Sequence, residues 1–258
     1  MKDKTIWRIR QAATPGVLDL YIYGDVEGDY LDLWTWSIVE SETSAQKFRE
    51  ELNSHPDVTQ INIYINSMGG YVFEGTAIYN QLKRHPAHKT VYVDGFACSI
   101  ASVIAMAGDE VVMPRNALMM IHNMSMSVSG NAAELRKAAD DLEIINAAGR
   151  QAYLMKSGGK IEEQTLVQLM ENESWLTAEQ CLEYGFADRY ADQDADMSKA
   201  ANVLQKANLN LSQRLEIQKS LVAQIRQLCQ NQEQPPADPE PTPVTQEKNS
   251  ILKLFERS

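Results

Sequence analysis

The sequence predicts an α/β domain, and three observations support that prediction. Segments in which apolar and polar residues alternate recur between residues 18 and 190, as expected of β-strands. Segments with the helical spacing of apolar residues separate them, and a glycine stands at most of the junctions. Strands that alternate with helices are typical of α/β folds. We therefore expect one α/β domain over residues 1–192 of the 258-residue chain.

The first half of this domain combines three expected strands with three expected helices. The first strand alternates strictly and meets Gly24-Asp25, which is a turn signal. The second strand carries three isoleucines on one face. Ser41, Thr43 and Ser44 are candidate N-cap residues for the first helix. The expected strands are residues 18–23, 60–66 and 89–94, and the expected helices are residues 44–52, 75–83 and 99–107.

The second half of the domain is expected to be mainly helical. Asn131 is a candidate N-cap for a long helix, which closes near Gly158-Gly159. Gly185 separates the last helix from a closing strand that ends near Tyr190. The expected strands before this point are residues 110–113 and 117–121, and the expected helices are residues 131–156, 160–171 and 177–184.

The composition changes after residue 192. Residues 193–230 contain an acidic linker and a segment with heptad-like apolar spacing, which predicts a helix. This helix either packs on its own domain or associates with a second copy. Residues 231–258 contain a proline-rich spacer and an apolar tip, which is either a docking peptide or a frayed end. We therefore expect a helical and then disordered C-terminal extension.

Composition and charge exclude several classes of function. The formal net charge is -11, so phosphate backbones and anionic membrane surfaces would repel the chain. No apolar segment has the length of a signal-peptide core or of a membrane-spanning helix. The three cysteines are widely spaced and form no CxxC pair, which favours buried thiols in a reducing compartment. The sequence predicts a cytoplasmic protein without a metal or cofactor, and without a nucleic-acid or membrane partner.

Three segments carry residue types suited to catalysis. Ser99 opens an apolar helix directly after a β-rich run, where a nucleophile would be exposed beside backbone N–H groups. The same position also suits an N-cap serine. Gly69-Gly70 follows a strand and can turn backbone N–H groups toward an oxyanion, or form a plain turn. His122 ends an apolar run and becomes a candidate general base when it is paired with Ser99.

Four ordered motifs resemble those of the Clp protease proteolytic subunit (ClpP) family. They are the glycine loop at Asn66–Gly70, the nucleophile motif at Gly95–Ser99, the histidine motif at Met120–Asn123 and the C-terminal signature at Trp175–Asp188. The similarity covers about residues 17–190. The resemblance implies a ClpP/crotonase-like fold of repeated ββα units and a serine endopeptidase that cleaves proteins and peptides. It also implies homo-oligomeric rings that enclose the active sites.

The resemblance assigns roles to individual residues of this chain. It implies that Ser99 is the nucleophile and that His122 is the general base. It also implies that the backbone N–H groups of Gly70 and Ile100 form the oxyanion hole.

The third triad position lies two residues before Trp175 and holds Glu173, where the family has an aspartate. Glutamate orients the histidine in some serine-hydrolase triads, but its extra methylene changes the reach of the carboxylate. Asn172 is the alternative orienting residue. Asp188 is expected to belong to the closing strand.

Departures from the family pattern point to a specialised member. Met68 replaces the proline usual before the paired glycines, residues 6–16 do not resemble the axial segment that engages an unfoldase, and the chain extends well beyond the fold. This architecture resembles the Clp-like peptidases of phages and prophages, which process capsid and scaffold proteins during head maturation. We therefore expect an ATP-independent peptidase of this kind in the cytoplasm of a bacterial host cell.

Three alternatives stay open at this point. The first is a housekeeping Clp peptidase subunit that works with an ATP-driven unfoldase. The second is a crotonase-like acyl-CoA enzyme, against which a covalent fluorophosphonate adduct would argue. The third is a non-catalytic scaffold that keeps the peptidase fold.

Overall fold

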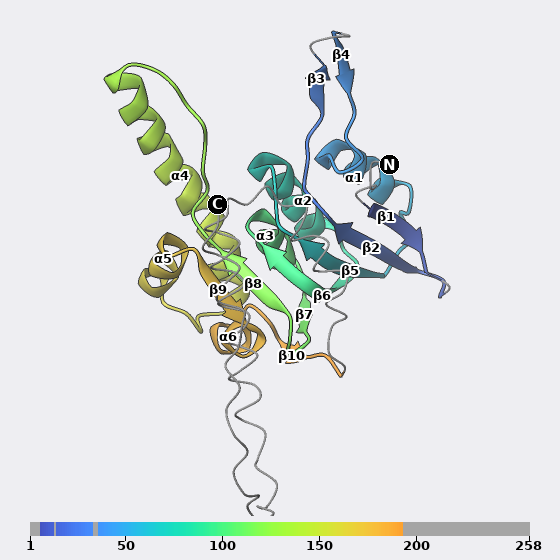
Figure 1. The fold of residues 1–258 in the computed structure, drawn as a ribbon. Helices are drawn as coiled ribbons and strands as arrows, with labels where there is room; N and C mark the ends of the chain where they lie inside the picture. The colour runs from blue at the N-terminus through green and yellow to red at the C-terminus, as the bar shows by residue number, and fades with distance from the viewer. Residues whose placement is uncertain (1–5, 13, 33–35, 193–258) are drawn as a thin grey trace, which may run out of the picture. The chain divides into compact units, whose positions relative to one another are not determined.

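The computed structural model describes residues 6–12, 14–32 and 36–192. The expected extension, both the linker with its helix at 193–230 and the spacer with its tip at 231–258, lies outside the described residues. Strands and helices alternate along the described chain (Figure 1). The helices are α1 (Ala45–Asn53), α2 (Val72–Arg84), α3 (Ile100–Ala105), α4 (Ala132–Ser157), α5 (Glu163–Glu171) and α6 (Ala178–Tyr184). The strands are β1 (Ile6–Gln11), β2 (Val17–Tyr23), β3 (Tyr30–Asp32), β4 (Ser37–Val39), β5 (Gln60–Ser67), β6 (His88–Cys98), β7 (Glu110–Met113), β8 (Leu118–Ile121), β9 (Ser174–Thr177) and β10 (Arg189–Tyr190).

A mixed sheet with the order β1-β2-β5-β6-β7-β10 forms the centre of the described domain. β1 is antiparallel to β2, whereas β2, β5, β6 and β7 are parallel neighbours. β6 pairs twice, first with β7 and then, from Phe96 to Cys98, with β8. β8 pairs antiparallel with β9. The predicted α/β class is confirmed, and the mixed sheet is consistent with the ClpP/crotonase-like fold that the resemblance implies.

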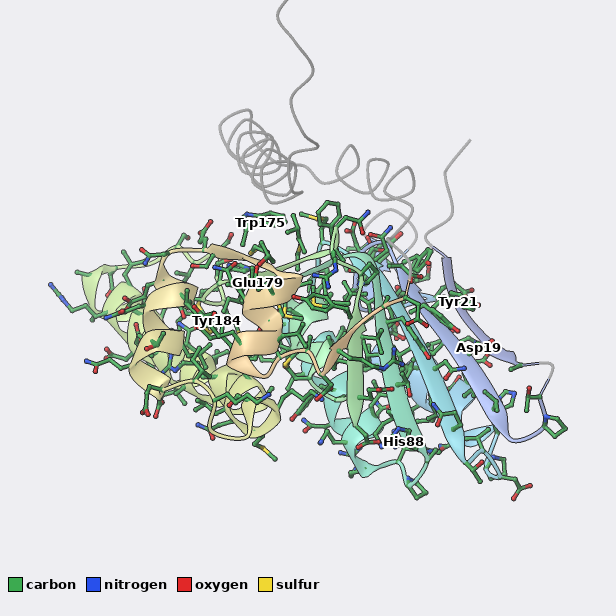
Figure 2. The ribbon with its side chains drawn as sticks, turned by 90° about the horizontal axis from the view of Figure 1, so that it is seen from below. Asp19, Tyr21, His88, Trp175, Glu179 and Tyr184 are labelled. Carbon is green, nitrogen blue, oxygen red and sulfur yellow. The ribbon has the colours of Figure 1, made fainter. Side chains whose placement is uncertain are left out.

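The alternation in the strands separates a buried face from a polar and aromatic face. On β2 the buried side chains are Leu18, Leu20 and Ile22, and on β5 they are Ile61, Ile63 and Ile65. Figure 2 shows Asp19 and Tyr21, which alternate with the buried residues of β2. Tyr21 stacks on Tyr64 with ring centroids 4.8 Å apart, and Tyr64 stacks on Tyr92 at 5.1 Å. The period of two predicted from the sequence therefore sets which face forms the core.

Four strands go beyond the sequence-based prediction: β1, β3, β4 and β9. β3 and β4 form a short hairpin that projects from the domain (Figure 1), and each contributes three residues to it. β9 ends at Thr177, which forms a capping box with Gln180 at the start of α6. The sequence therefore shows the signal of the helix at this point and hides the short strand before it. β6 was expected to end before Gly95, but it continues to Cys98 because β8 provides a partner for its last residues.

Helix α4 begins with the predicted cap and ends at the predicted glycine. Asn131 and Glu134 form a reciprocal capping box, and Gly158 adopts the left-handed conformation of a C-cap. Tyr153 is buried at 1% exposure, so its ring belongs to the core of the domain and not to an exposed face of α4. Among the residues that the structure describes, no helix combines the length and apolarity needed to cross a bilayer.

A salt bridge connects the end of α4 with the closing strand. Lys156 Nζ donates to Asp188 Oδ2 over 2.6 Å, and the same oxygen accepts the Val111 N–H at 2.6 Å. Asp188, which the sequence places in the closing strand, lies directly before β10 and joins α4, β7 and the start of that strand.

Candidate active site

Ser99 lies between the last residue of β6 and the first residue of α3. Its backbone has φ 54° and ψ -130°, a conformation that L-residues rarely adopt outside strained functional positions. The Ser99 N–H donates to the carbonyl of Met120 over 2.8 Å, and the Ser99 carbonyl accepts the Ser102 N–H at 3.0 Å. The turn is therefore fixed from both sides and presents the hydroxyl at the end of the sheet.

His122 follows the last residue of β8. Because β8 pairs with the end of β6, with Cys98 opposite Met120, the next residues of both strands come together. His122 Nε2 lies 2.7 Å from Ser99 Oγ, which is hydrogen-bond distance. The structure thus brings together the two side chains that the sequence motifs single out.

Two hydrogen bonds hold the segment that carries His122. The Asn123 N–H donates to the Met170 carbonyl over 3.2 Å. The Met124 N–H donates to Oδ1 of the buried Asn146 on α4 over 2.8 Å. The position of the imidazole therefore depends on α4 and α5 as well as on the sheet. The spacing of residues in the sequence contained no signal for Asn146.

Burial lowers the pKa of His122 below its ordinary value. The negative charge of Glu173 and a hydrogen bond with the backbone of Asn123 raise the pKa and oppose this effect. Burial dominates because desolvation disfavours the imidazolium. The ring is therefore neutral at neutral pH and can accept a proton from a hydroxyl group.

Glu173 lies directly before β9 and opposite His122 in the extended strand register. Met120 pairs with Trp175 and Ile121 pairs with Ser174, so the next positions along both chains are His122 and Glu173. Glu173 has φ 47°, a second strained backbone next to the site. Within the described residues its carboxylate affects the imidazole through charge and forms no hydrogen bond with the ring.

The residues next to Glu173 have other positions in the fold. Asn172 is the C-cap residue of α5. Trp175, labelled in Figure 2, meets Phe96 of β6 edge to face with the ring centroids 6.0 Å apart. This contact packs β9 against β6 beside the site.

The glycine loop lies against the turn that carries Ser99. Gly70 has φ 145°, and a Cβ atom there would lie 2.1 Å from the carbonyl oxygen of Val26. Val26 holds the loop by accepting the Tyr71 N–H and donating to the Gly69 carbonyl, each over 2.8 Å. Val26 is a further residue of the site for which the sequence contains no distinctive signal.

The two expected oxyanion donors are both available. Among the described residues, neither the Gly70 N–H nor the Ile100 N–H donates to a protein acceptor. Ile100 N lies 3.2 Å from the position that a Cβ atom of Gly69 would occupy, so the loop and the helix start are adjacent. In the described part of the chain, no group of three or more His, Cys, Asp or Glu side chains could hold a metal ion.

Comparison with known proteins identifies the family. The profile of the family described as Clp protease matches residues 41–194. The chain belongs to the Clp protease family. It is therefore a serine endopeptidase, and the prediction of that activity is confirmed.

Several curated members of the Clp protease family are similar to this chain. The ATP-dependent Clp protease proteolytic subunit 1 of Streptomyces avermitilis is 31% identical over 154 residues, which cover 58% of this chain and 70% of that protein. The ATP-dependent Clp protease proteolytic subunit of Deinococcus radiodurans is 30% identical over 145 residues, or 55% of this chain and 70% of that protein. Subunit 1 of Corynebacterium jeikeium is 31% identical over 140 residues, or 53% and 73%.

Proposed function

We propose that Ser99 is the nucleophile of this Clp-type peptidase and that His122 is its general base. The observation that carries the proposal is the 2.7 Å contact between His122 Nε2 and Ser99 Oγ at a strained strand-to-helix turn. His122 accepts the hydroxyl proton as Ser99 Oγ attacks the scissile carbonyl, and then gives that proton to the leaving amine. Water hydrolyses the acyl-enzyme with His122 again acting as the base.

In this mechanism the negative oxygen of the tetrahedral intermediate is bound by the N–H groups of Gly70 and Ile100. Their lack of other acceptors in the described residues supports this role. Such donors contribute about 3–4 kcal/mol each to transition-state stabilisation. Glu173 stabilises the imidazolium that forms at His122, since its charge favours the protonated ring.

The proposal extends to assembly and substrate delivery. The named relatives are proteolytic subunits of ATP-dependent Clp proteases, which favours a homo-oligomeric ring that degrades proteins delivered by an ATP-driven unfoldase. This housekeeping function is an alternative that the sequence left open. The relatives support it better than they support a role in phage head maturation. Exposed apolar side chains on α4, namely Leu135, Ile144 and Met155, are suited to contacts between subunits.

A second candidate function is cleavage of capsid or scaffold proteins during phage head maturation, without ATP. The observation that favours it is the end of the family match at residue 194 of a 258-residue chain. Met68 in the glycine loop also departs from the usual family pattern.

One experiment tests the catalytic proposal. The full-length protein is treated with a fluorophosphonate, and the adduct is mapped by intact and peptide mass spectrometry. We expect one adduct, on Ser99, that disappears in Ser99→Ala together with hydrolysis of a fluorogenic peptide. Full hydrolysis by folded Ser99→Ala would overturn the assignment.

A second experiment separates the two candidate functions. Degradation of a folded protein substrate is measured with and without ATP and the unfoldase of the host. Dependence on both supports the ATP-dependent subunit. Cleavage of a capsid or scaffold protein without ATP, lost on truncation after Asp192 while peptide hydrolysis persists, supports head maturation instead.

A further inference from the structure

Behind the nucleophile, two buried hydroxyl groups lie in a row that ends at the backbone of Ser99. Ser102 Oγ lies 2.5 Å from the Ser99 carbonyl oxygen. Tyr153 OH on α4 lies 2.7 Å from Ser102 Oγ. Both residues are buried, with exposures of 0% and 1%. The family motifs in the sequence include neither of them.

The direction of these hydrogen bonds follows because each hydroxyl group has one proton to donate and the carbonyl has none. A carbonyl oxygen can only accept, so the single hydroxyl proton of Ser102 points to the Ser99 carbonyl, which is closer than the Met120 carbonyl at 3.4 Å. Ser102 Oγ must then accept from Tyr153, which keeps its proton because burial raises the pKa of its phenol well above the usual range. The row is therefore a one-way relay from Tyr153 through Ser102 to the Ser99 carbonyl.

The Ser99 carbonyl belongs to the same peptide unit as the Ile100 N–H. In a trans peptide the C=O and N–H bonds point in opposite directions, and the structure contains no cis peptide among its described residues. A carbonyl held in the core by Ser102 therefore turns the N–H outward, toward the site. Hydrogen bonds to a carbonyl also polarise the amide, which makes its N–H a stronger donor.

We propose that Ser102 and Tyr153 are positioning residues that orient and polarise the Ser99–Ile100 peptide, so that the Ile100 N–H binds the oxyanion. This inference rests on the proposed function, because it assigns a support to one of its two oxyanion donors. It also explains how the strained backbone of Ser99 is maintained: a backbone donor and a side-chain donor both hold its carbonyl.

The test uses the full-length protein with Ser102→Ala, Tyr153→Phe and the double variant. For a fluorogenic peptide we expect Ser102→Ala to lower kcat by about tenfold with KM within about twofold, since the donor is misaligned but not removed. Tyr153→Phe, which removes one oxygen, is expected to lower kcat by about threefold. The double variant should match Ser102→Ala alone, because members of one relay are not additive.

A matched control separates positioning from general loss of packing. Ser157, also buried on α4, donates its hydroxyl to the Leu154 carbonyl and has no part in the relay. Ser157→Ala should leave kcat unchanged. Thermal unfolding of each variant is measured in parallel, and Tyr153→Phe tests the relay if Ser102→Ala does not fold.

A second readout reports on the oxyanion directly. A peptide aldehyde forms a tetrahedral adduct with the nucleophile, so its inhibition constant should rise by the same factor by which kcat falls. Unchanged kcat and inhibition constant in folded Ser102→Ala or Tyr153→Phe would overturn the relay. Fluorophosphonate labelling of Ser99 in the wild type would then still stand, so the relay can fail while the proposed function survives.

Discussion

The glycine loop lies so close to Ser99 that a Cβ atom on Gly69 would be 2.6 Å from the Cβ atom of Ser99. Gly69 also has φ 102°, which disfavours any L side chain. A methyl group here would push apart the loop and the turn that carry the two proposed oxyanion donors.

We therefore expect Gly69→Ala to lower kcat by about 100-fold or more, as the loss of one oxyanion donor does, while the protein stays folded. The measurement is steady-state hydrolysis of a fluorogenic peptide. Gly158→Ala is the matched control, since Gly158 also has a positive φ of 60° but has no atom within 4 Å of an added Cβ. If both variants lose activity equally, backbone strain and not contact with Ser99 is the cause.

The pH profile tests how Glu173 acts on His122. In the proposed mechanism activity requires the neutral imidazole, so it should fall as the pH drops through the pKa of His122. The charge of Glu173 raises that pKa against the larger effect of burial. Glu173→Gln should therefore move the acid limb of kcat/KM to lower pH.

The same variant should lower kcat by about 100-fold. This is less than the roughly 10⁴-fold loss seen where a triad carboxylate is hydrogen-bonded to the histidine, because Glu173 acts through charge alone. Asn172→Ala serves as the comparison. A larger loss in Asn172→Ala, or an acid limb that moves to higher pH in Glu173→Gln, would transfer the orienting role to another residue.

The salt bridge between Lys156 and Asp188 should contribute to stability and not to catalysis. Lys156 is 8% exposed, so removing its partner leaves a buried charge that only the Gly108 and Asp109 carbonyls still stabilise. Asp188→Ala also removes the acceptor of the Val111 N–H. We expect a loss of about 1–3 kcal/mol in the free energy of unfolding, measured by urea titration, with kcat at 25 °C nearly unchanged.

The exposed ion pair Lys137–Asp141 on the same helix supplies the control. Asp141→Ala should change stability by less than about 0.5 kcal/mol, as is usual for surface pairs. A large loss of kcat in Asp188→Ala would instead place Asp188 in the active site.

Assembly above the dimer is the fourth prediction, to be measured by light scattering. Ile144 on α4 is 70% exposed, and an apolar side chain so open to solvent is suited to a subunit contact. Ile144→Glu should lower the mass of the oligomer, whereas Gln151→Glu on the same helix should not. An active wild-type monomer at micromolar concentration would contradict the prediction.

Sequence patterns predicted most of the core of this fold, because burial on one face of a strand imposes a period of two on β2 and β5. Strands without such a pattern were harder to predict. β1 lies at the edge of the sheet, and β9 exists because β8 pairs with it.

The candidate site likewise contains residues that the sequence predicted and residues that it did not. Ser99, His122 and the glycines stand in recognisable motifs, and the structure brings them together. Val26, Asn146 and Tyr153 reach the site through hydrogen bonds with segments far away in the sequence, and the bond of Ser102 to the Ser99 carbonyl depends on the strained turn at Ser99. Such partners depend on tertiary packing, which no local pattern of residues encodes.

The double pairing of β6 has a consequence for the newly made chain. Ser99 meets His122 only after β8 has joined the end of β6, and Glu173 reaches its place only when β9 has joined β8. Synthesis proceeds from the N-terminus, so a ribosome must add residues up to about Thr177 before the three side chains can assemble. The complete geometry of the proposed catalytic residues therefore forms only once most of the domain has been translated.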